Sequence, residues 1–185
     1  MLFLACVALG VILGLATGGR LGNVARLRLR WPWLVVVAFV IREATVLTPL
    51  RNVEGIQYVY AASFAALLAW ILWHVNRVPG LWLGAAGSAL NLVVIAANNG
   101  RMPVAPEVAG SLVQRGHVGQ YTLMGSGTHF NWLADWIVLP GPFTLGVYSP
   151  GDLIVAVGTV VVIVLVMRLK TEPEETSRRI VNDPP

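Results

Sequence analysis

Residues 152–167 read DLIVAVGTVVVIVLVM, a single acidic residue followed by a nearly unbroken apolar run. A helix needs about 20 such residues to cross the hydrocarbon core of a bilayer, and about 17 suffice where the bilayer adapts. Four earlier stretches have a similar length and composition. We therefore expect five membrane-spanning helices, at residues 2–18, 31–47, 56–73, 81–97 and 152–167.

The composition of the whole chain agrees with a membrane protein. Of the 185 residues, 56% are hydrophobic and 12% are charged, and the mean hydropathy is +0.71. Soluble domains carry about 25% charged residues, so this chain lacks the charge that would cover a globule in water. The single cysteine excludes an internal disulfide. The basic residues lie between apolar runs, and we expect no nucleic-acid partner.

The basic residues also predict an orientation, because cytoplasmic loops collect Lys and Arg. Nine basic residues fall in segments that five spans would place inside, and three, Arg51, Arg101 and Arg115, fall in segments outside. We therefore expect a multi-pass protein of a bacterial plasma membrane, with its N-terminus outside and its C-terminus in the cytoplasm. Residues 2–18 could instead be a signal peptide. A signal peptide has its basic residues before the apolar run, however, whereas the arginines of this chain follow it.

Residues 1–170 are expected to form one transmembrane domain, and residues 171–185 a disordered cytoplasmic tail. The connection at residues 98–150 is too rich in Trp, Phe, Leu and Val for a disordered loop. We expect it to form an ordered extracytoplasmic cap that contains short amphipathic helices, one starting at Pro106 and one within residues 128–137. The predicted fold class is an all-α membrane protein.

Small residues recur at helical spacing in two spans. Gly10, Gly14 and Gly18 share a face of the first span, and Gly84 and Ser88 share a face of the fourth. This spacing lets helices approach closely in lipid. Packing within the bundle is one interpretation, and self-association or binding of a membrane protein partner is the other.

Polar residues within the spans are candidates for a binding site. Arg42 and Glu43 interrupt the second span, and Asn91 lies near the middle of the fourth. Ionisable residues at such positions are functional candidates. Arg42 could instead extend to the interface, and Asn91 could bond to a neighbouring helix. The cap and the start of the last span add further candidate binding residues: Asn98, Asn99, Arg101, Thr128, His129, Asp135 and Asp152.

The spacing of acidic, histidine and serine residues in the cap matches no metal-binding or nucleophile motif. We therefore expect no metal, no cofactor and no catalytic residue.

The cap also carries a family resemblance. Residues 98–103 read NNGRMP and are followed by Pro106-Glu107, which resembles the signature of an uncharacterised family of small bacterial integral membrane proteins. The likeness continues through residues 123–140 and covers most of residues 1–170. Asn99 stands where the family usually has Gly. The resemblance implies a membrane topology and no established activity.

The leading functional expectation is a non-enzymatic accessory, scaffold, or lipid- or partner-binding protein in the bilayer. A small-solute transport or binding protein using Arg42, Glu43 and Asn91 is the alternative, although no inverted repeat is visible. A membrane enzyme acting at the outer face through His129, Asp135 or Asp152 is a third hypothesis.

Overall fold

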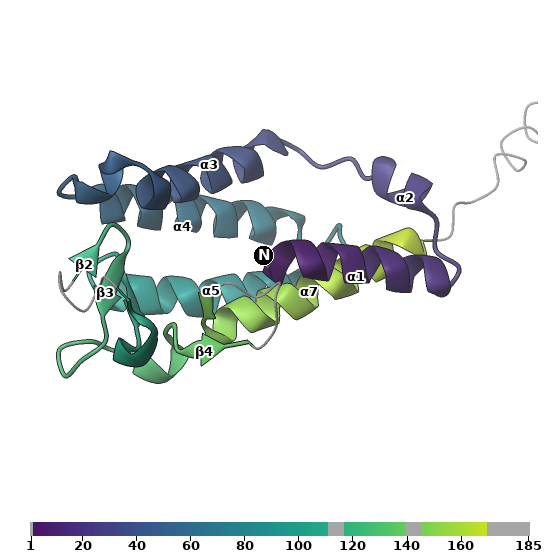
Figure 1. The fold of residues 1–185 in the computed structure, drawn as a ribbon. Helices are drawn as coiled ribbons and strands as arrows, with labels where there is room; N and C mark the ends of the chain where they lie inside the picture. The colour runs from purple at the N-terminus through teal and green to yellow at the C-terminus, as the bar shows by residue number, and fades with distance from the viewer. Residues whose placement is uncertain (1, 111–116, 140–145, 170–185) are drawn as a thin grey trace, which may run out of the picture.

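In a computed structural model of the chain, the residues described are 2–110, 117–139 and 146–169. Helices dominate the structure (Figure 1). The five long ones are α1 (Leu2–Ala16), α3 (Trp33–Leu47), α4 (Ile56–His74), α5 (Leu81–Ala97) and α7 (Pro150–Met167). Two short ones, α2 (Leu21–Ala25) and the 3-10 helix η1 (Pro49–Asn52), lie in the connections. A long helix occupies each of the five predicted ranges, and the tail predicted at 171–185 lies outside the described residues.

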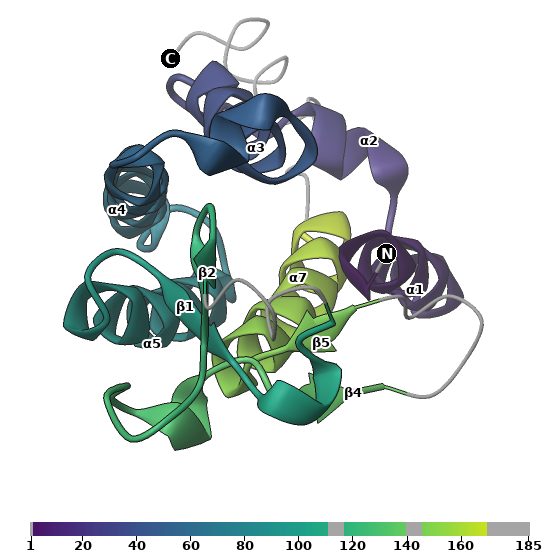
Figure 2. The same ribbon diagram turned by 60° about the vertical axis from the view of Figure 1, so that its left-hand side comes forward.

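The long helices run along a common axis, and each packs against the next in the order α3, α4, α5, α7, α1 (Figures 1 and 2). The last helix of the chain therefore lies between α5 and the first helix. Short connections make α3–α4 and α4–α5 hairpins, whereas a long segment joins α5 to α7. One end of the bundle thus carries most of the non-helical chain (Figure 1).

Glycines in α1 permit its close contact with α7. Gly10 lies against Ile163, where an added Cβ would come within 3.0 Å of the isoleucine Cβ, and Gly14 lies against Met167. The later glycine of α1 contacts the later residue of α7, so the two helices run in the same direction. Gly18 instead follows the end of α1 with φ +81°, a left-handed conformation that favours glycine. The structure therefore places Gly10 and Gly14, but not Gly18, in the helix interface.

The contact between α5 and α7 is closer still. A Cβ on Gly151 would lie 2.6 Å from Cγ of Asn91, and one on Gly87 would lie 2.5 Å from the Gly151 carbonyl oxygen. Both glycines therefore allow the backbones to meet. A Cβ on Gly84, which we predicted for this role together with Ser88, would meet only a side chain of its own helix within 4 Å, whereas a Cβ on Gly158 of α7 would lie 3.0 Å from the Gly84 backbone nitrogen. Ser88 is buried.

The segment between α5 and α7 differs from the predicted cap of amphipathic helices. It contains a three-stranded sheet of order β1-β3-β2 and a two-stranded antiparallel sheet, β4-β5. The strands are β1 (Met102–Val104), β2 (His117–Val118), β3 (Tyr121–Leu123), β4 (Ile137–Val138) and β5 (Val147–Tyr148). Single 3-10 turns, η2 (Pro106–Val108) and η3 (Asn131–Leu133), stand where helices were expected. The all-α prediction is therefore wrong for the described part of this segment, although the chain is mostly helical.

A small core joins this segment to the bundle. It combines side chains of α4, α5, β1 and the turn after η3, and its buried members are Tyr60, Val94, Ile95, Met102, Leu133 and Ala134. Tyr121 packs against the same cluster. This core holds β1 and β3 across the end of α4 and α5, and the candidate functional residues surround it.

Part of the apolar helical surface is not covered by protein. Two helices, α4 and α7, are long and apolar enough to cross a membrane, with mean hydropathies of 1.5 and 2.4. Only 22% of the apolar stretch of α4 and 28% of that of α7 are buried. Exposed large side chains also occur along α1 and α3, including Phe3, Ile12, Val36 and Phe39.

Candidate functional site

The structure brings nine of the ten predicted binding residues into two groups. Five of them line one hollow, here called the outer hollow: Asn98, Asn99, Arg101, Thr128 and His129. Four contribute to a polar cluster, here called the inner cluster: the buried Asn91 and Asp135, the half-buried Asp152 and the exposed Arg42. The tenth, Glu43, lies in α3, and within the described part of the chain it takes part in neither group.

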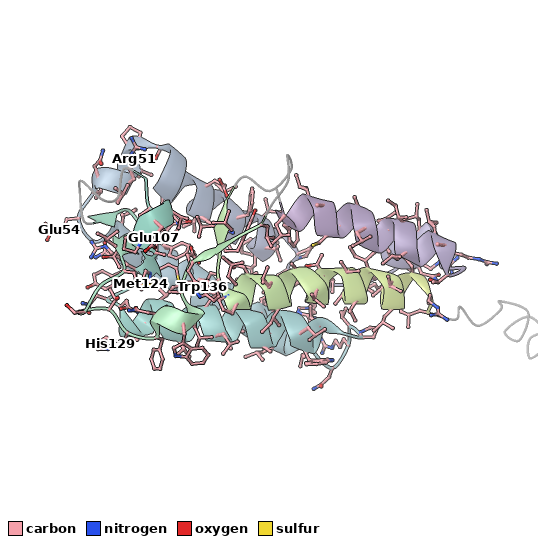
Figure 3. The ribbon with its side chains drawn as sticks, turned by 60° about the horizontal axis from the view of Figure 1, so that its bottom comes forward. Arg51, Glu54, Glu107, Met124, His129 and Trp136 are labelled. Atoms are coloured by element: carbon pink, nitrogen blue, oxygen red, sulfur yellow. The ribbon has the colours of Figure 1, made fainter. Side chains whose placement is uncertain are left out.

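The outer hollow has a volume of about 160 Å³ and opens at the end of α5. Its wall combines the helix end, the start of β1, strand β3 and the turn that precedes η3. His129 lies at the same end of the molecule as Arg51 and Glu54 (Figure 3). The eight lining residues are Ala97, Asn98, Asn99, Arg101, Thr122, Gly127, Thr128 and His129. Polar side chains predominate, and no lining residue is acidic.

Asn98 fixes one wall of the hollow. Its Nδ2 donates to the carbonyl oxygens of Val94, at 2.8 Å, and His129, at 2.9 Å. Its Oδ1 accepts from the His129 backbone N–H at 2.8 Å. Asn98 therefore ties the end of α5 to the opposite turn with a paired set of bonds. The hydrogen-bonding groups of its side chain are therefore paired within the protein, and the residue shapes the hollow by holding its two walls together.

The turn at residues 125–131 is closed by its own side chains. Thr128 Oγ1 accepts from the Gly125 N–H at 3.0 Å, and it lies 2.8 Å from the Gly125 carbonyl oxygen and 2.7 Å from Asn131 Oδ1. The single hydroxyl proton bonds to one of those two oxygens. Phe130 adopts φ 56°, which reverses the chain into η3. Asn131 was not predicted, because its contribution lies in this local turn.

Two groups in the hollow lack hydrogen-bond partners among the residues that the structure describes. Among the described residues, nothing hydrogen-bonds to the guanidinium of Arg101, and its Nε is buried. The exposed ring of His129 likewise bonds to none of them, although its backbone is tied to Asn98. Asn99 has φ 54° and an exposed side chain at the rim. A buried guanidinium N–H without an acceptor is costly, so an acceptor brought by a ligand would be favoured.

The inner cluster lies on the other face of β3. Successive side chains of a strand point to opposite faces. Thr122 lines the outer hollow, whereas its neighbour Tyr121 interacts electrostatically with the guanidinium of Arg42. Burial raises the pKa of the Tyr121 hydroxyl, and the charge of Arg42 opposes that rise. Arg42, which is exposed in the structure, therefore interacts with this cluster from α3.

One part of the inner cluster is a satisfied network that links α5 to α7. Ser149 Oγ donates to Asn91 Oδ1 at 2.8 Å and accepts from the Asp152 N–H at 3.0 Å. The Asp152 oxygens accept from Asn91 Nδ2, at 2.8 Å, and from the Ser149 N–H, at 3.1 Å. Ser149 and Asp152 thus form a capping box, and Asn91 connects it to α5.

Asp135 is less well satisfied than Asp152. Its backbone joins β1, since its N–H donates to the Pro103 carbonyl at 3.0 Å and its carbonyl accepts from the Ala105 N–H at 2.9 Å. The side chain is 6% exposed, and Oδ1 is buried without a partner among the described residues. Burial raises the pKa of the Asp135 carboxyl well above its ordinary value, the charge of Asp152 raises it further, and Arg42 opposes both.

Four residues in or near the inner cluster were not predicted as site residues. Tyr60 and Tyr121 interact electrostatically with Arg42, and the buried side chains of Thr45 and Gln120 bond to each other. A buried glutamine in a connection has no distinguishing signal in one sequence. No three His, Cys, Asp or Glu residues gather as a metal would require in the ranges that the structure describes.

Comparison with known proteins places the chain in a known family. The profile of a family of unknown function, DUF5317, matches residues 26–164, which include both groups of candidate residues. An uncharacterized protein of Thermotoga maritima is 29% identical over 169 residues, which cover 89% of this chain and 92% of that protein. No solved structure matches the chain.

Proposed function

We propose that this chain, which belongs to the DUF5317 family of unknown function, is an integral membrane protein that binds a small anionic group in the outer hollow without catalysing a reaction. The observation that carries the proposal is Arg101. Its guanidinium lines a polar hollow, contains a buried N–H, and has no hydrogen-bond partner among the described residues. Arginine presents several N–H donors and no acceptor, so phosphate and carboxylate groups match its chemistry.

Membrane insertion is supported by the exposed apolar surface. A core helix of a soluble protein would be buried if it were apolar on all sides, whereas a membrane span can face lipid. The low burial of α4 and α7 fits the second case. The 15 residues of α1 and of α3 rise by about 23 Å each, and flanking arginines and tryptophans suit the interfaces beyond them. We propose that all five long helices cross the bilayer.

The orientation proposed from sequence is supported by where the basic residues lie. Asn23, just after α1, donates to the Met167 carbonyl at 2.8 Å, and the Arg30 N–H donates to His74 Nε2 at 3.1 Å. These bonds bring the segment between α1 and α3 to the ends of α7 and α4. Arginines accordingly gather at this end of the bundle: Arg20, Arg26, Arg28, Arg30, Arg77 and Arg168. We propose that this end faces the cytoplasm and that the outer hollow faces outward.

The electrostatics of the hollow favour an anion over a cation. Arg101 carries a permanent positive charge, and among the described residues no acidic side chain lines the wall and none bonds to the ring of His129 at its edge. Phosphate-type groups reach this level of a bilayer on lipid headgroups as well as in solution. Both sources present the same oxygens to the guanidinium, so the proposal concerns the anionic group that they share.

The test compares two arginines at the same end of the molecule. We expect inorganic phosphate, or nanodiscs containing phosphatidylglycerol rather than phosphatidylcholine, to raise the thermal unfolding midpoint of the full chain. Arg101→Gln should abolish this rise, whereas Arg51→Gln, which removes an exposed arginine, should retain it. The phosphate and lipid arms identify the source. Equal responses of the two variants, or no rise with either probe, would refute the proposal.

A partner-binding role remains a second candidate, favoured by α3. This helix packs on α4 and exposes Val36, Phe39 and Val40 over most of its length. The faces of Gly10 and Gly14 are covered by α7 in the monomer, so α3 is the better surface for a membrane partner. Purification in mild detergent tests this role: co-purification of a partner that Phe39→Ala releases would support it, and a solitary monomer would contradict it.

A further inference from the structure

The inner cluster contains more acidic groups than its one cation can balance. Arg42 comes from α3, Tyr60 from α4, Tyr121 from β3 and Asp152 from α7, and all interact electrostatically with one another or with Asp135. With both carboxyls ionised and both tyrosines neutral, the charges are one positive and two negative. Asp135 is buried, so an ionised carboxyl at this residue, near that of Asp152, is unfavourable in its low-dielectric surroundings.

The hydrogen bonds distinguish the two carboxyls. Both oxygens of Asp152 accept bonds, one from Asn91 Nδ2 and one from the Ser149 N–H. Bonds of this kind stabilise a carboxylate. Asp135 Oδ1 accepts none from the described residues, although the side chain is buried. The proton that would neutralise the cluster is therefore favoured on Asp135 rather than on Asp152.

We propose that the inner cluster is a proton-binding site in which Asp135 carries one exchangeable proton at neutral pH and Arg42 is the counter-ion of Asp152. Release converts the Asp135 carboxylic acid to a carboxylate and gives the proton to solvent, so that the cluster changes from neutral to a charge of minus one. The inference does not depend on anion binding in the outer hollow. It stands on the burial of Asp135, its unpartnered oxygen and the single cation facing two carboxyls.

The direction of each electrostatic effect follows from the cluster. The negative charge of Asp152 disfavours ionisation of Asp135, and the positive charge of Arg42 favours it. Removing Arg42 should therefore make the proton harder to release, and removing the charge of Asp152 should make it easier. A purely structural Asp135 that was already ionised would show neither effect at neutral pH.

The experiment is an infrared titration of the full-length protein in lipid nanodiscs. We expect the carbonyl stretch of a protonated carboxylic acid at neutral pH, lost in Asp135→Asn and retained in Glu107→Gln, which changes an exposed acid of η2. The midpoint at which this band disappears should rise by about one pH unit in Arg42→Gln and should stay unchanged in Arg42→Lys. It should fall in Asp152→Asn.

Three results would overturn the proposal: no such band in the wild type at neutral pH, its persistence in Asp135→Asn, or the same midpoint in Arg42→Gln as in Arg42→Lys. Should Asp135→Asn not fold, the wild-type band and the two Arg42 variants still decide the matter. Arg42→Lys keeps the charge, so the pair separates an electrostatic role of this side chain from a packing role.

Discussion

Asn91 is a buried side chain that positions its neighbours in the inner cluster through hydrogen bonds. Its amide oxygen accepts from Ser149, and its amide nitrogen donates to Asp152. Ser149 is the N-cap of α7 and Asp152 lies in its first turn, where Gly151 leaves room for the amide. The polar group in the middle of α5 is thereby satisfied, as an amide in lipid must be. Its bonds also hold Asp152 in place within the inner cluster.

Gly151→Ala should destabilise the protein, because the new methyl group would overlap the Asn91 side chain. We expect a loss of about 1–3 kcal/mol in the free energy of unfolding, as for other overpacked positions. Gly22→Ala in α2, where an added Cβ meets nothing within 4 Å, is the matched control. Chemical unfolding in detergent measures both, and equal stability of the two variants would show that the close approach is absent.

Residue type alone explains which parts of the site could be predicted. Arg101, Thr128 and His129 are polar residues in an apolar connection, so each is conspicuous in the sequence. Tyr121 is not conspicuous, because a tyrosine near a span is ordinarily placed at the interface. Its role depends on β3, which brings it opposite Arg42 from a position far along the chain. Such long-range pairing is not encoded in local spacing.

The sequence predicts some helices and strands more clearly than others. The long helices were predicted to within about two residues at each end, because their apolar runs are long and bounded by Pro, Gly and Arg. The strands β1 to β5 have two or three residues each, which is too short for an alternating pattern. The parallel pairing of β1 with β3 also joins residues that are 19 apart, Met102 and Tyr121. The sequence therefore predicted short helices from Pro106 and within residues 128–137 but none of these strands, and the described part has the single 3-10 turns η2 and η3 at those places.

Asn98→Ala should loosen the turn at residues 125–131, because it removes every bond that ties His129 to the end of α5. The buried position suggests a cost of about 1–3 kcal/mol. Hydrogen exchange should accelerate at the His129 amide. Asn99→Ala, which changes an exposed side chain at the rim, should leave exchange unchanged. Comparable protection in both variants would contradict this account of the turn.

On the scale of the whole molecule, charge and polarity divide the bundle into two ends. Arginines lie in the connections at the end near α2, and His129, which lines the polar hollow, lies at the opposite end (Figures 1 and 3). Between these ends, only 22% and 28% of the apolar stretches of α4 and α7 are buried, and α1 and α3 expose large apolar side chains. A bilayer would cover that surface and leave both polar ends in water, which is the arrangement proposed here.

Cysteine labelling in intact cells tests this arrangement. In a Cys6→Ser background, Ser126→Cys should react with a membrane-impermeant maleimide, because residue 126 is exposed near the outer hollow. Asn76→Cys, at an exposed position between α4 and α5, should react only after the cells are opened. The reverse pattern would invert the proposed orientation. Labelling of both positions in intact cells would contradict a membrane barrier between them.

The pairing of α1 with α7 has a consequence for biosynthesis. A ribosome makes α1 first, yet the helix that covers Gly10 and Gly14 is made last. Until translation reaches α7, the glycine face of α1 can only meet lipid or other chains. The hydrogen bonds from Arg20 and Asn23 to the Met167 carbonyl likewise cannot form until the end of α7 has been translated. Insertion of the first helix and closure of the bundle are therefore separate events. In a chain that stops before α7, the glycine face of α1 stays uncovered.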